Sequence, residues 1–257
     1  MGGISTLQRD LSVGIERQVV HQRSMATVIV ALGGSLLRPE VDERHAWLTE
    51  LVTIVRDRVA AGDRIGLVVG GGAPAREGIE LARPIIDDVD HLDRIGIAAT
   101  RLNATIIREA LAEEGIRVTG TIPRSVNEAV ESLLQRDVVV MGGTVPGHTT
   151  DAVAIRLAIR GGARKCIIAT NVAKVHAEDP QGNPDAESFD RLTLAELQAI
   201  VGPAEHSSAG GSQVVDPVGV GEAIRYRMPL DILDGRNPQS IRLSLEDEDF
   251  GGTVVGV

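Results

Sequence analysis

The amino-acid sequence predicts one α/β domain, a three-layer αβα sandwich around a mainly parallel central sheet. Several short segments, such as Val28–Leu32 and Val138–Met141, are apolar throughout, as strands are when both faces of a sheet are covered. Segments with helical spacing of apolar residues separate these strands, which is the order that produces parallel pairing. No change of composition divides the 257 residues into two domains. We therefore expect the two halves of one sandwich to meet where the strands end.

The first half of the domain alternates strands with helices. Residues 1–24 are polar without a clean period, and we interpret them as an extension that is either disordered or not translated, so the domain covers 25–257. Gly62 and Gly115 follow two apolar-periodic segments, and glycine is favoured just beyond a helix. The predicted elements are, in order, a strand at 28–32, a helix at 48–59, a strand at 65–69, a helix from about 74 and a helix at 95–114.

The second half continues the alternation. Thr149 and Thr150 stand before an apolar-periodic segment and can cap it. A polar loop with Pro180, Gly182 and Pro184 interrupts the order later on. The predicted elements are a short strand near 116–118, a helix at 127–134, strands at 138–141 and 166–170 around a helix at 149–159, helices at 194–201 and 218–226, a strand at 230–233, a helix at 238–243 and a strand at 253–255.

Composition excludes several classes of function. The net charge of −10 repels nucleic-acid phosphates, so we expect no nucleic-acid partner. There is no apolar run of about 18 residues and no signal-peptide pattern, which indicates a cytoplasmic protein without a membrane partner. The single cysteine, Cys166, lies in an apolar run and is interpreted as a buried small hydrophobe. The histidines form no metal-ligand spacing, so no metal ligands are assigned.

Glycine turns follow three of the predicted strands, at 33–35, 70–72 and 142–144. Glycine lets backbone amides approach an anion closely, and the N-terminus of the following helix favours negative charge. One such turn is weak support for a site, because glycines at strand ends are often plain turns. Three of them at the ends of neighbouring strands predict a polyphosphate held from several sides.

Two common phosphate motifs do not explain this pattern. A Walker A loop needs a lysine after its last glycine, and neither Lys165 nor Lys174, the only lysines, follows a glycine. The stretch Gly70–Ala75 satisfies the G-x-G-x-x-A pattern of dinucleotide-binding folds, with acids at 87 and 88. It follows the second strand, however, and a single pyrophosphate site would leave the other two glycine turns unexplained.

Five motifs carry a family resemblance. They are Gly33–Ser35, Gly70–Arg76, Asp93–Ala104, Val140–Ala154 and Thr170–Val172. Together they resemble the archaeal-type uridylate (UMP) kinases of the amino acid kinase superfamily, over roughly Met25 to the C-terminus and most specifically around 141–154. The resemblance implies an αβα sandwich, usually assembled as a hexamer. It also implies transfer of the γ-phosphoryl group of ATP to UMP with Mg²⁺, in pyrimidine nucleotide metabolism.

The resemblance also implies roles for single residues. Asp151 would orient the catalytic groups, and Arg76 would reach phosphate oxygens. The UMP-binding residues would be Gly71, Asp93, Gly143, Thr144, Val145, Pro146, Gly147, His148 and Thr149. The ATP-binding residues would be Gly33, Gly34, Ser35, Gly72, Arg76, Thr170, Asn171, His176 and Asp179. Arg101 and Asn103 would be support or oligomer contacts.

The sequence departs from the family pattern on the ATP side. Where the family continues Asp-Gly-Val-Tyr after Thr170–Val172, this chain has Ala173-Lys-Val-His176, which loses a carboxylate and an aromatic ring. Ala31 stands where many members carry a lysine. We hypothesise that Lys174 supplies the missing cation, because a developing phosphoryl charge needs one besides magnesium. Chance placement of Lys174 on a loop is the alternative.

Simpler interpretations remain open for the other residues and for the whole chain. Asp151 would equally complement a helix dipole, and Arg76 would equally form a surface ion pair. The chain could be a superfamily member with another small phosphate or carboxylate acceptor, although Gly70–Gly72 lacks the histidine expected of isopentenyl phosphate kinase. A non-catalytic nucleotide-binding paralogue is the alternative from another class.

Overall fold

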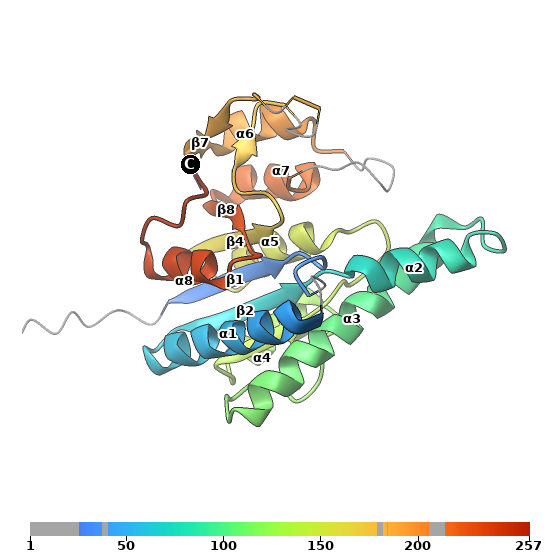
Figure 1. Cartoon of the computed structure of the whole chain (residues 1–257), viewed down its shortest axis with the longest axis vertical. Coiled ribbons are helices and arrows are strands. Elements are labelled where there is room, and N and C mark those ends of the chain that lie inside the picture. The colour runs from blue at the N-terminus through green and yellow to red at the C-terminus, as the bar shows by residue number, and fades with distance from the viewer. Residues whose placement is uncertain (1–25, 38–40, 179–181, 184, 206–213) are drawn as a thin grey trace, which may run out of the picture.

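The computed structural model describes residues 26–37, 41–178, 182–183, 185–205 and 214–257, with the backbone only at 41–43. The predicted extension at 1–24 and Asp179 lie outside these residues. Figure 1 shows a central sheet with helices on both faces. The sheet strands, in spatial order, are β3 (Val138–Met141), β2 (Arg64–Val69), β1 (Thr27–Leu32), β4 (Lys165–Thr170), β8 (Leu230–Asp234), β9 (Thr253–Gly256) and β7 (Arg191–Thr193).

The order in which strands are added to the sheet reverses at β1. From β1 the chain adds β2 and then β3 on one side, and it returns to place β4 and β8 on the other, all four pairings being parallel. β9 runs antiparallel to β8 and parallel to β7. In open sheets, ligands bind at the carboxyl ends of the strands where the order reverses. The topology therefore points to the ends of β1, β2 and β4.

Two hydrophobic cores lie on the two faces of the sheet. The helices are α1 (Val41–Ala60), α2 (Gly72–Ala82), α3 (Val89–Glu113), α4 (Val126–Leu133), α5 (Thr150–Arg160), α6 (Leu194–Val201), α7 (Pro217–Tyr226) and α8 (Pro238–Glu246). α4, α5, α6 and α7 pack on the face that presents Ile29 and Ala31, whereas α1, α3 and α8 pack on the face that presents Val28 and Val30. Alternate residues of each strand thus enter opposite cores, which is why the strands are apolar throughout.

The prediction of a mainly parallel sheet covered on both faces is confirmed. The predicted strand near 116–118 is wrong, because Val118 makes only an isolated bridge to Val138. α3 begins six residues earlier than expected, at Val89, where Asp88 accepts a hydrogen bond from the His91 backbone N–H. This first turn lies on the α2–α3 hairpin, which projects from the sandwich in Figure 1.

Three short strands were not expected. β5 (Val175–His176) and β6 (Ser188–Phe189) form a separate antiparallel pair around the polar loop, and β7 is only three residues long. Segments of two or three residues are too short to show alternation. None of the described helices is long and apolar enough to cross a membrane.

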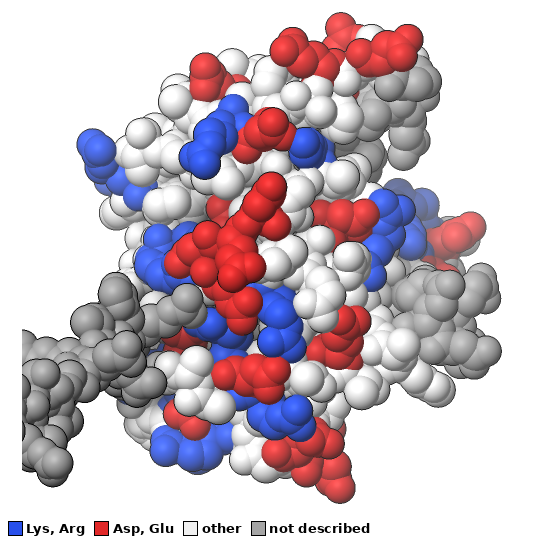
Figure 2. Space-filling model, turned by 60° about the vertical axis from the view of Figure 1, so that its left-hand side comes forward, with Lys and Arg blue, Asp and Glu red and all other residues white. Residues whose placement is uncertain are grey.

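Charged side chains of both signs cover the face shown in Figure 2. A group of acidic side chains gathers near its middle, with basic side chains beside it. At the amino-terminal ends of the strands, Lys165 is buried and its ammonium donates to Asp231 at 2.6 Å and to Asp247 at 3.0 Å. One of the two lysines therefore has a structural role at the end of the sheet opposite to the glycine turns.

Candidate functional site

The glycine turns after β1 and β2 lie directly against each other. A Cβ atom on Gly34 would collide with the backbone nitrogen of Gly72 and would lie 2.7 Å from the carbonyl carbons of Gly70 and Gly71. Gly72 has a φ of +59°, and a Cβ there would collide with the carbonyl oxygen of Gly34. Backbone packed this closely leaves no room for a side chain at Gly34 or Gly72. The ends of the two strands thus form one continuous surface, on which Gly34, Gly71 and Gly72 are half-buried.

The end of β4 joins this surface from the other side of β1. The Gly33 backbone N–H donates to the carbonyl oxygen of Ala169 at 2.9 Å, and a Cβ on Gly33 would lie 3.7 Å from the Cα of Thr170. Ser35 and Asn171 are exposed. The predicted ATP-side residues Gly33, Gly34, Ser35, Gly72, Thr170 and Asn171 therefore stand on adjoining turns at the point where the strand order reverses.

The turns after β2 and β3 are held by two buried side chains of α3. Thr100 accepts a hydrogen bond from the Gly143 backbone N–H at 2.7 Å. The Asn103 side-chain amide donates to the carbonyl oxygens of Gly70 at 2.8 Å and Gly71 at 3.0 Å. Thr100 and Asn103 are three positions apart and so share one helix face. Asn103 has the supporting role that its motif implied, whereas Thr100, which lies in the same motif, was assigned no role.

The segment 142–149, which we call the acceptor loop, packs on the same helix. Asp93 accepts a hydrogen bond from the Gly147 backbone N–H at 2.7 Å. The Arg101 guanidinium lies 3.4 Å from the carbonyl oxygen of Thr144. Three residues of the predicted UMP site, Gly143, Thr144 and Gly147, are thus bonded to the amino-terminal half of α3. Val145 and Gly147 are exposed, and Thr144, Pro146 and His148 are half-buried.

The end of the acceptor loop is tied to a second helix through Asp216. The Thr149 hydroxyl accepts a hydrogen bond from the Ala152 N–H at 3.2 Å, which caps α5, and donates to Asp216 at 2.6 Å. The other carboxylate oxygen of Asp216 accepts from the N–H groups of Val218 at 2.7 Å and Gly219 at 3.0 Å, which caps α7. The sequence signal for Asp216 was its place before Pro217, the arrangement of an N-cap followed by proline.

Asp151 lies in the first turn of α5, next to Asp216. Burial raises its pKa, the negative charge of Asp216 raises it further, and a hydrogen bond from the Asp216 backbone lowers it, leaving the pKa at about 7 against an ordinary value of 3.8. Two carboxyl groups that share a confined site cannot both ionise freely. Asp151 consequently titrates near neutral pH, as a group that transfers protons or binds a cation in catalysis should.

The remaining predicted residues lie on the borders of the site. Arg76 is exposed on α2, four residues after Gly72. The Lys174 ammonium forms an ion pair with Asp190 and lowers the pKa of that carboxyl. His176 lies in β5, and its Nδ1 is 3.2 Å from the carbonyl oxygen of Ala186. Lys174 thus has a carboxylate partner, and it would have to break this ion pair before it could bind phosphate.

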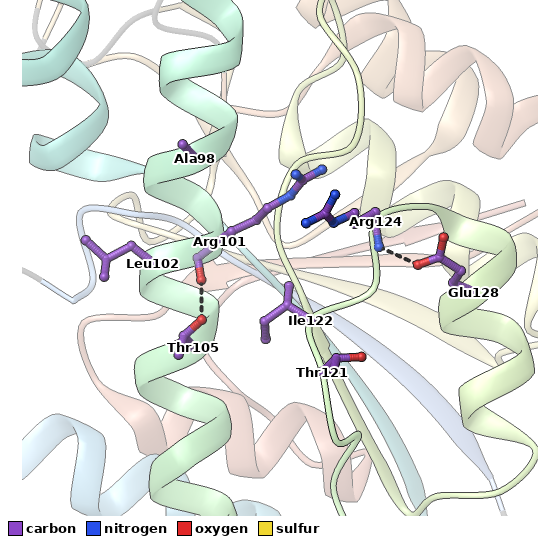
Figure 3. A pocket seen from close by; sticks show the side chains of 8 residues that line it. All are labelled: Ala98, Arg101, Leu102, Thr105, Thr121, Ile122, Arg124 and Glu128. Atoms are coloured by element: carbon purple, nitrogen blue, oxygen red, sulfur yellow. Dashed lines mark hydrogen bonds between the residues drawn. The ribbon is translucent and has the colours of Figure 1, made fainter.

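A groove of about 600 Å³ opens beside the acceptor loop, between α3 and the segment 121–128. Figure 3 shows the side chains of Arg101 and Arg124 pointing toward each other from its two walls. The Nε atom of Arg101 is buried and has no hydrogen-bond partner among the described residues. Leu102 and Ile122 supply apolar lining. Arg101 also reaches Thr144, so the groove adjoins the loop that carries the predicted UMP residues.

Comparison with known proteins gives a consistent result over most of the chain. The family model described as "Amino acid kinase family" matches residues 26–234. A uridylate kinase of Methanospirillum hungatei is 38% identical over 231 residues, which cover 90% of this chain and 95% of the relative. A uridylate kinase of Haloquadratum walsbyi is 36% identical over 228 residues, which cover 89% of this chain and 92% of the relative.

Solved structures show the same likeness. The crystal structure of uridylate kinase from Archaeoglobus fulgidus is 34% identical, with a TM-score of 0.76, and the match covers 90% of this chain and 100% of that one. The crystal structure of UMP kinase from Bacillus anthracis has a TM-score of 0.73 at 22% identity, which shows a shared fold. The sequence likeness and the likeness of fold thus each extend over about nine-tenths of the chain, and the family model spans all three glycine turns.

Proposed function

The chain belongs to the amino acid kinase family, in the branch that holds the archaeal uridylate kinases, and we propose that it transfers the γ-phosphoryl group of ATP to UMP, forming ADP and UDP. One structural observation supports this most: the glycine turns after β1 and β2 abut each other, β4 ends beside them, and α3 ties the turn after β3 to the turn after β2. Phosphoryl transfer depends mainly on positioning and charge stabilisation, and such a surface of peptide groups supplies both.

UMP would bind to the acceptor loop. Its phosphate would meet Arg76, whose exposed guanidinium can form two parallel hydrogen bonds with phosphate oxygens. Its ribose and base would lie along the loop, within reach of Asp93 and the Thr144 hydroxyl. Asp93 uses one carboxylate oxygen to hold Gly147, so its second oxygen is the one available to a ribose hydroxyl. The residues proposed for UMP are Gly71, Asp93, Gly143, Thr144, Val145, Pro146, Gly147, His148 and Thr149.

ATP would bind on the other side of β1. The residues proposed for it are Gly33, Gly34, Ser35, Gly72, Arg76, Thr170, Asn171, His176 and Asp179. Gly34 and Gly72 would offer backbone N–H groups, and Ser35 a hydroxyl, to phosphate oxygens, whereas the Gly33 N–H is already bonded to Ala169. Lys174 would have to exchange Asp190 for a phosphate oxygen in order to act, and such an exchange is within reach of a flexible lysine side chain.

The residues present fit a magnesium ion that arrives with ATP. Kinases commonly hold Mg²⁺ by one or two carboxylates and by the phosphates of the substrate. Among the described residues no three acidic, histidine or cysteine side chains are gathered for a metal, whereas Asp151 is a carboxyl group whose pKa of about 7 a cation would lower. Asp151 would therefore hold the ion, which neutralises charge on the transferred phosphoryl group. Asp216 and Thr149 keep Asp151 in place.

We further propose that the protein acts as a homohexamer in the cytoplasm, in pyrimidine nucleotide metabolism. Support for an oligomer comes from apolar side chains left exposed on the α2–α3 hairpin: Leu81 is 82% exposed and Ile85 is 88% exposed. Leu102 and Ile106 are exposed at helical spacing further along α3. An apolar surface of this kind on a charged protein is typical of an interface between chains.

Incubation of the purified protein with MgATP and each nucleoside monophosphate tests the proposal. We expect UDP to form from UMP much faster than products form from AMP, GMP or CMP. Binding of UMP without turnover would support the non-catalytic alternative. If the protein phosphorylates a different small phosphate or carboxylate acceptor and does not phosphorylate UMP, it is a family member with a different acceptor.

A further inference from the structure

Thr100 connects α3 to the start of the acceptor loop through a single buried hydroxyl group. The Thr100 side chain is 7% exposed. Its hydroxyl donates to the carbonyl oxygen of Ile97 at 2.6 Å, which directs its lone pairs away from that carbonyl and toward Gly143. The Gly143 backbone N–H donates to the same oxygen at 2.7 Å, and both glycines 142 and 143 are buried. The hydroxyl thus uses its proton and one of its lone pairs within the protein.

This contact explains the two glycines at the end of β3. A Cβ on Gly142 would lie 2.5 Å from the Thr100 hydroxyl oxygen and 2.9 Å from the Arg101 backbone nitrogen. A Cβ on Gly143 would lie 3.3 Å from that hydroxyl oxygen and from the Ile97 side chain. The glycines therefore allow α3 to approach the strand end. The Gly143 N–H, expected from the sequence to face an anion, points to Thr100 instead.

The other contacts of α3 show what this bond adds. Asp93 holds the far end of the acceptor loop through Gly147, and Asn103 holds the turn after β2. Asp93, Thr100 and Asn103 lie on one helix, so the spacing between the loop and the β2 turn is set by a rigid element. Of the three, only Thr100 contacts the point where the loop leaves the sheet.

We propose that Thr100 is a positioning residue for acceptor binding: its hydroxyl holds the Gly143 N–H and so fixes the start of the loop that receives the acceptor nucleotide. The identity of that nucleotide rests on the proposed function, but the bond itself does not. A loop that is held before UMP arrives loses less conformational entropy on binding. Loss of the bond should therefore weaken UMP binding while leaving the ATP side unchanged.

Thr100→Val removes the hydroxyl at nearly constant shape, and Thr100→Ser keeps it. We expect Thr100→Val to raise KM for UMP about tenfold, the size of effect expected for one lost buried hydrogen bond. KM for ATP should stay within about twofold, and Thr100→Ser should behave like the unmodified protein. Thr105→Val is the matched control, because the Thr105 hydroxyl also donates to a backbone carbonyl of α3, at 2.8 Å, but has no bond to either glycine turn. It should leave both constants unchanged.

Hydrogen exchange of the Gly143 amide, measured by NMR without nucleotide, tests the bond independently of activity. The amide should be protected in the unmodified protein and exchange at least about tenfold faster in Thr100→Val, with no change in Thr105→Val. Rapid exchange in the unmodified protein, or an equal rise of both KM values in Thr100→Val, would overturn the proposal. The Gly143 amide could prove protected in the unmodified protein and exchange faster in Thr100→Val, while the protein makes no UDP. That combination would refute the proposed function and leave the hydrogen bond established.

Discussion

Asp151 is the residue whose chemistry depends most on its surroundings. Its pKa of about 7 arises from burial and from the neighbouring Asp216. A carboxyl group whose folded-state pKa is raised binds its proton more tightly in the folded protein, so its ionisation destabilises the fold as pH rises from about 4 to about 7. A cation bound to Asp151 would reverse this, because it favours the ionised form. Ionisation of Asp151 thus lowers the stability of the free protein, and binding of the magnesium nucleotide can offset this loss.

Asp151→Asn should therefore raise the stability of the protein and lower its activity. The variant mimics the protonated form. The free energy of unfolding of the variant minus that of the unmodified protein should therefore rise by on the order of a few kcal/mol between pH 4 and pH 7 and stay constant above pH 7. Phosphoryl transfer should fall at least about a hundredfold. Urea unfolding at several pH values, with kinetics alongside, measures both. Asp87→Asn, which removes an exposed charge on the α2–α3 connection, is the control and should show neither effect. A pH-independent stability difference for Asp151→Asn would show that the carboxyl is not confined.

Lys174 presents the opposite situation, a charged group that already has a partner. If it reaches the transferred phosphoryl group, Lys174→Ala should lower kcat by about tenfold to a hundredfold with little change in KM for UMP. Asp190→Ala, which frees the ammonium, should not lower kcat. Steady-state kinetics of the two variants decide the matter. Equal turnover in Lys174→Ala and the unmodified protein would mean that the ion pair is a surface contact and that Lys174 stands on its loop by chance.

The two helix N-termini at Thr149 and Asp216 form one structural unit. Asp216 caps α7 and accepts the Thr149 hydroxyl, and Thr149 caps α5, which carries Asp151. Removal of one carboxylate therefore acts on both helices. Asn237 provides a comparison, because it caps α8 before Pro238 in the same way but lies after β8 and has no bond to the acceptor loop.

Asp216→Ala and Asn237→Ala should each lower the free energy of unfolding by about 1 kcal/mol, the usual value of an N-cap. Only Asp216→Ala should also impair catalysis. Without the Asp216 charge, the pKa of Asp151 should fall, so the pH dependence of kcat/KM should shift to lower pH. Thermal unfolding and pH–rate profiles measure the two effects. A normal pH profile in Asp216→Ala would show that the two carboxyl groups do not interact.

Elements with long, clear patterns could be predicted from the sequence, and those without could not. β1, β2, β3 and β4 were visible because they are apolar on both faces. β5, β6 and β7 were not, because two or three residues show no period. For the site, the glycine turns and Asp151 were recognisable from motifs. Thr100 was not, because a buried threonine in an apolar helix face gains its meaning only when Gly143 is brought next to it by the fold.

α3 contributes to two separate surfaces of the protein. Its buried face holds the glycine turns through Thr100 and Asn103, and its outer face exposes Leu102 and Ile106, 53% and 41% accessible. Because the helix is continuous from Val89 to Glu113, a partner chain seated on the outer face would fix the element that positions the acceptor loop. Oligomer formation and UMP binding should therefore be linked.

Leu102→Glu combined with Ile106→Glu tests this link. The two charges should break an apolar interface, because burying an unpaired carboxylate is costly, and should yield a smaller species by light scattering after size exclusion. KM for UMP should rise several-fold with the loss of the oligomer. Leu134→Glu, a change of the same kind at a side chain that is 70% exposed beyond α4, should alter neither mass nor KM. An unchanged mass in the double variant would place the interface elsewhere, and a smaller species with unchanged KM would show that α3 holds the acceptor loop without help from a second chain.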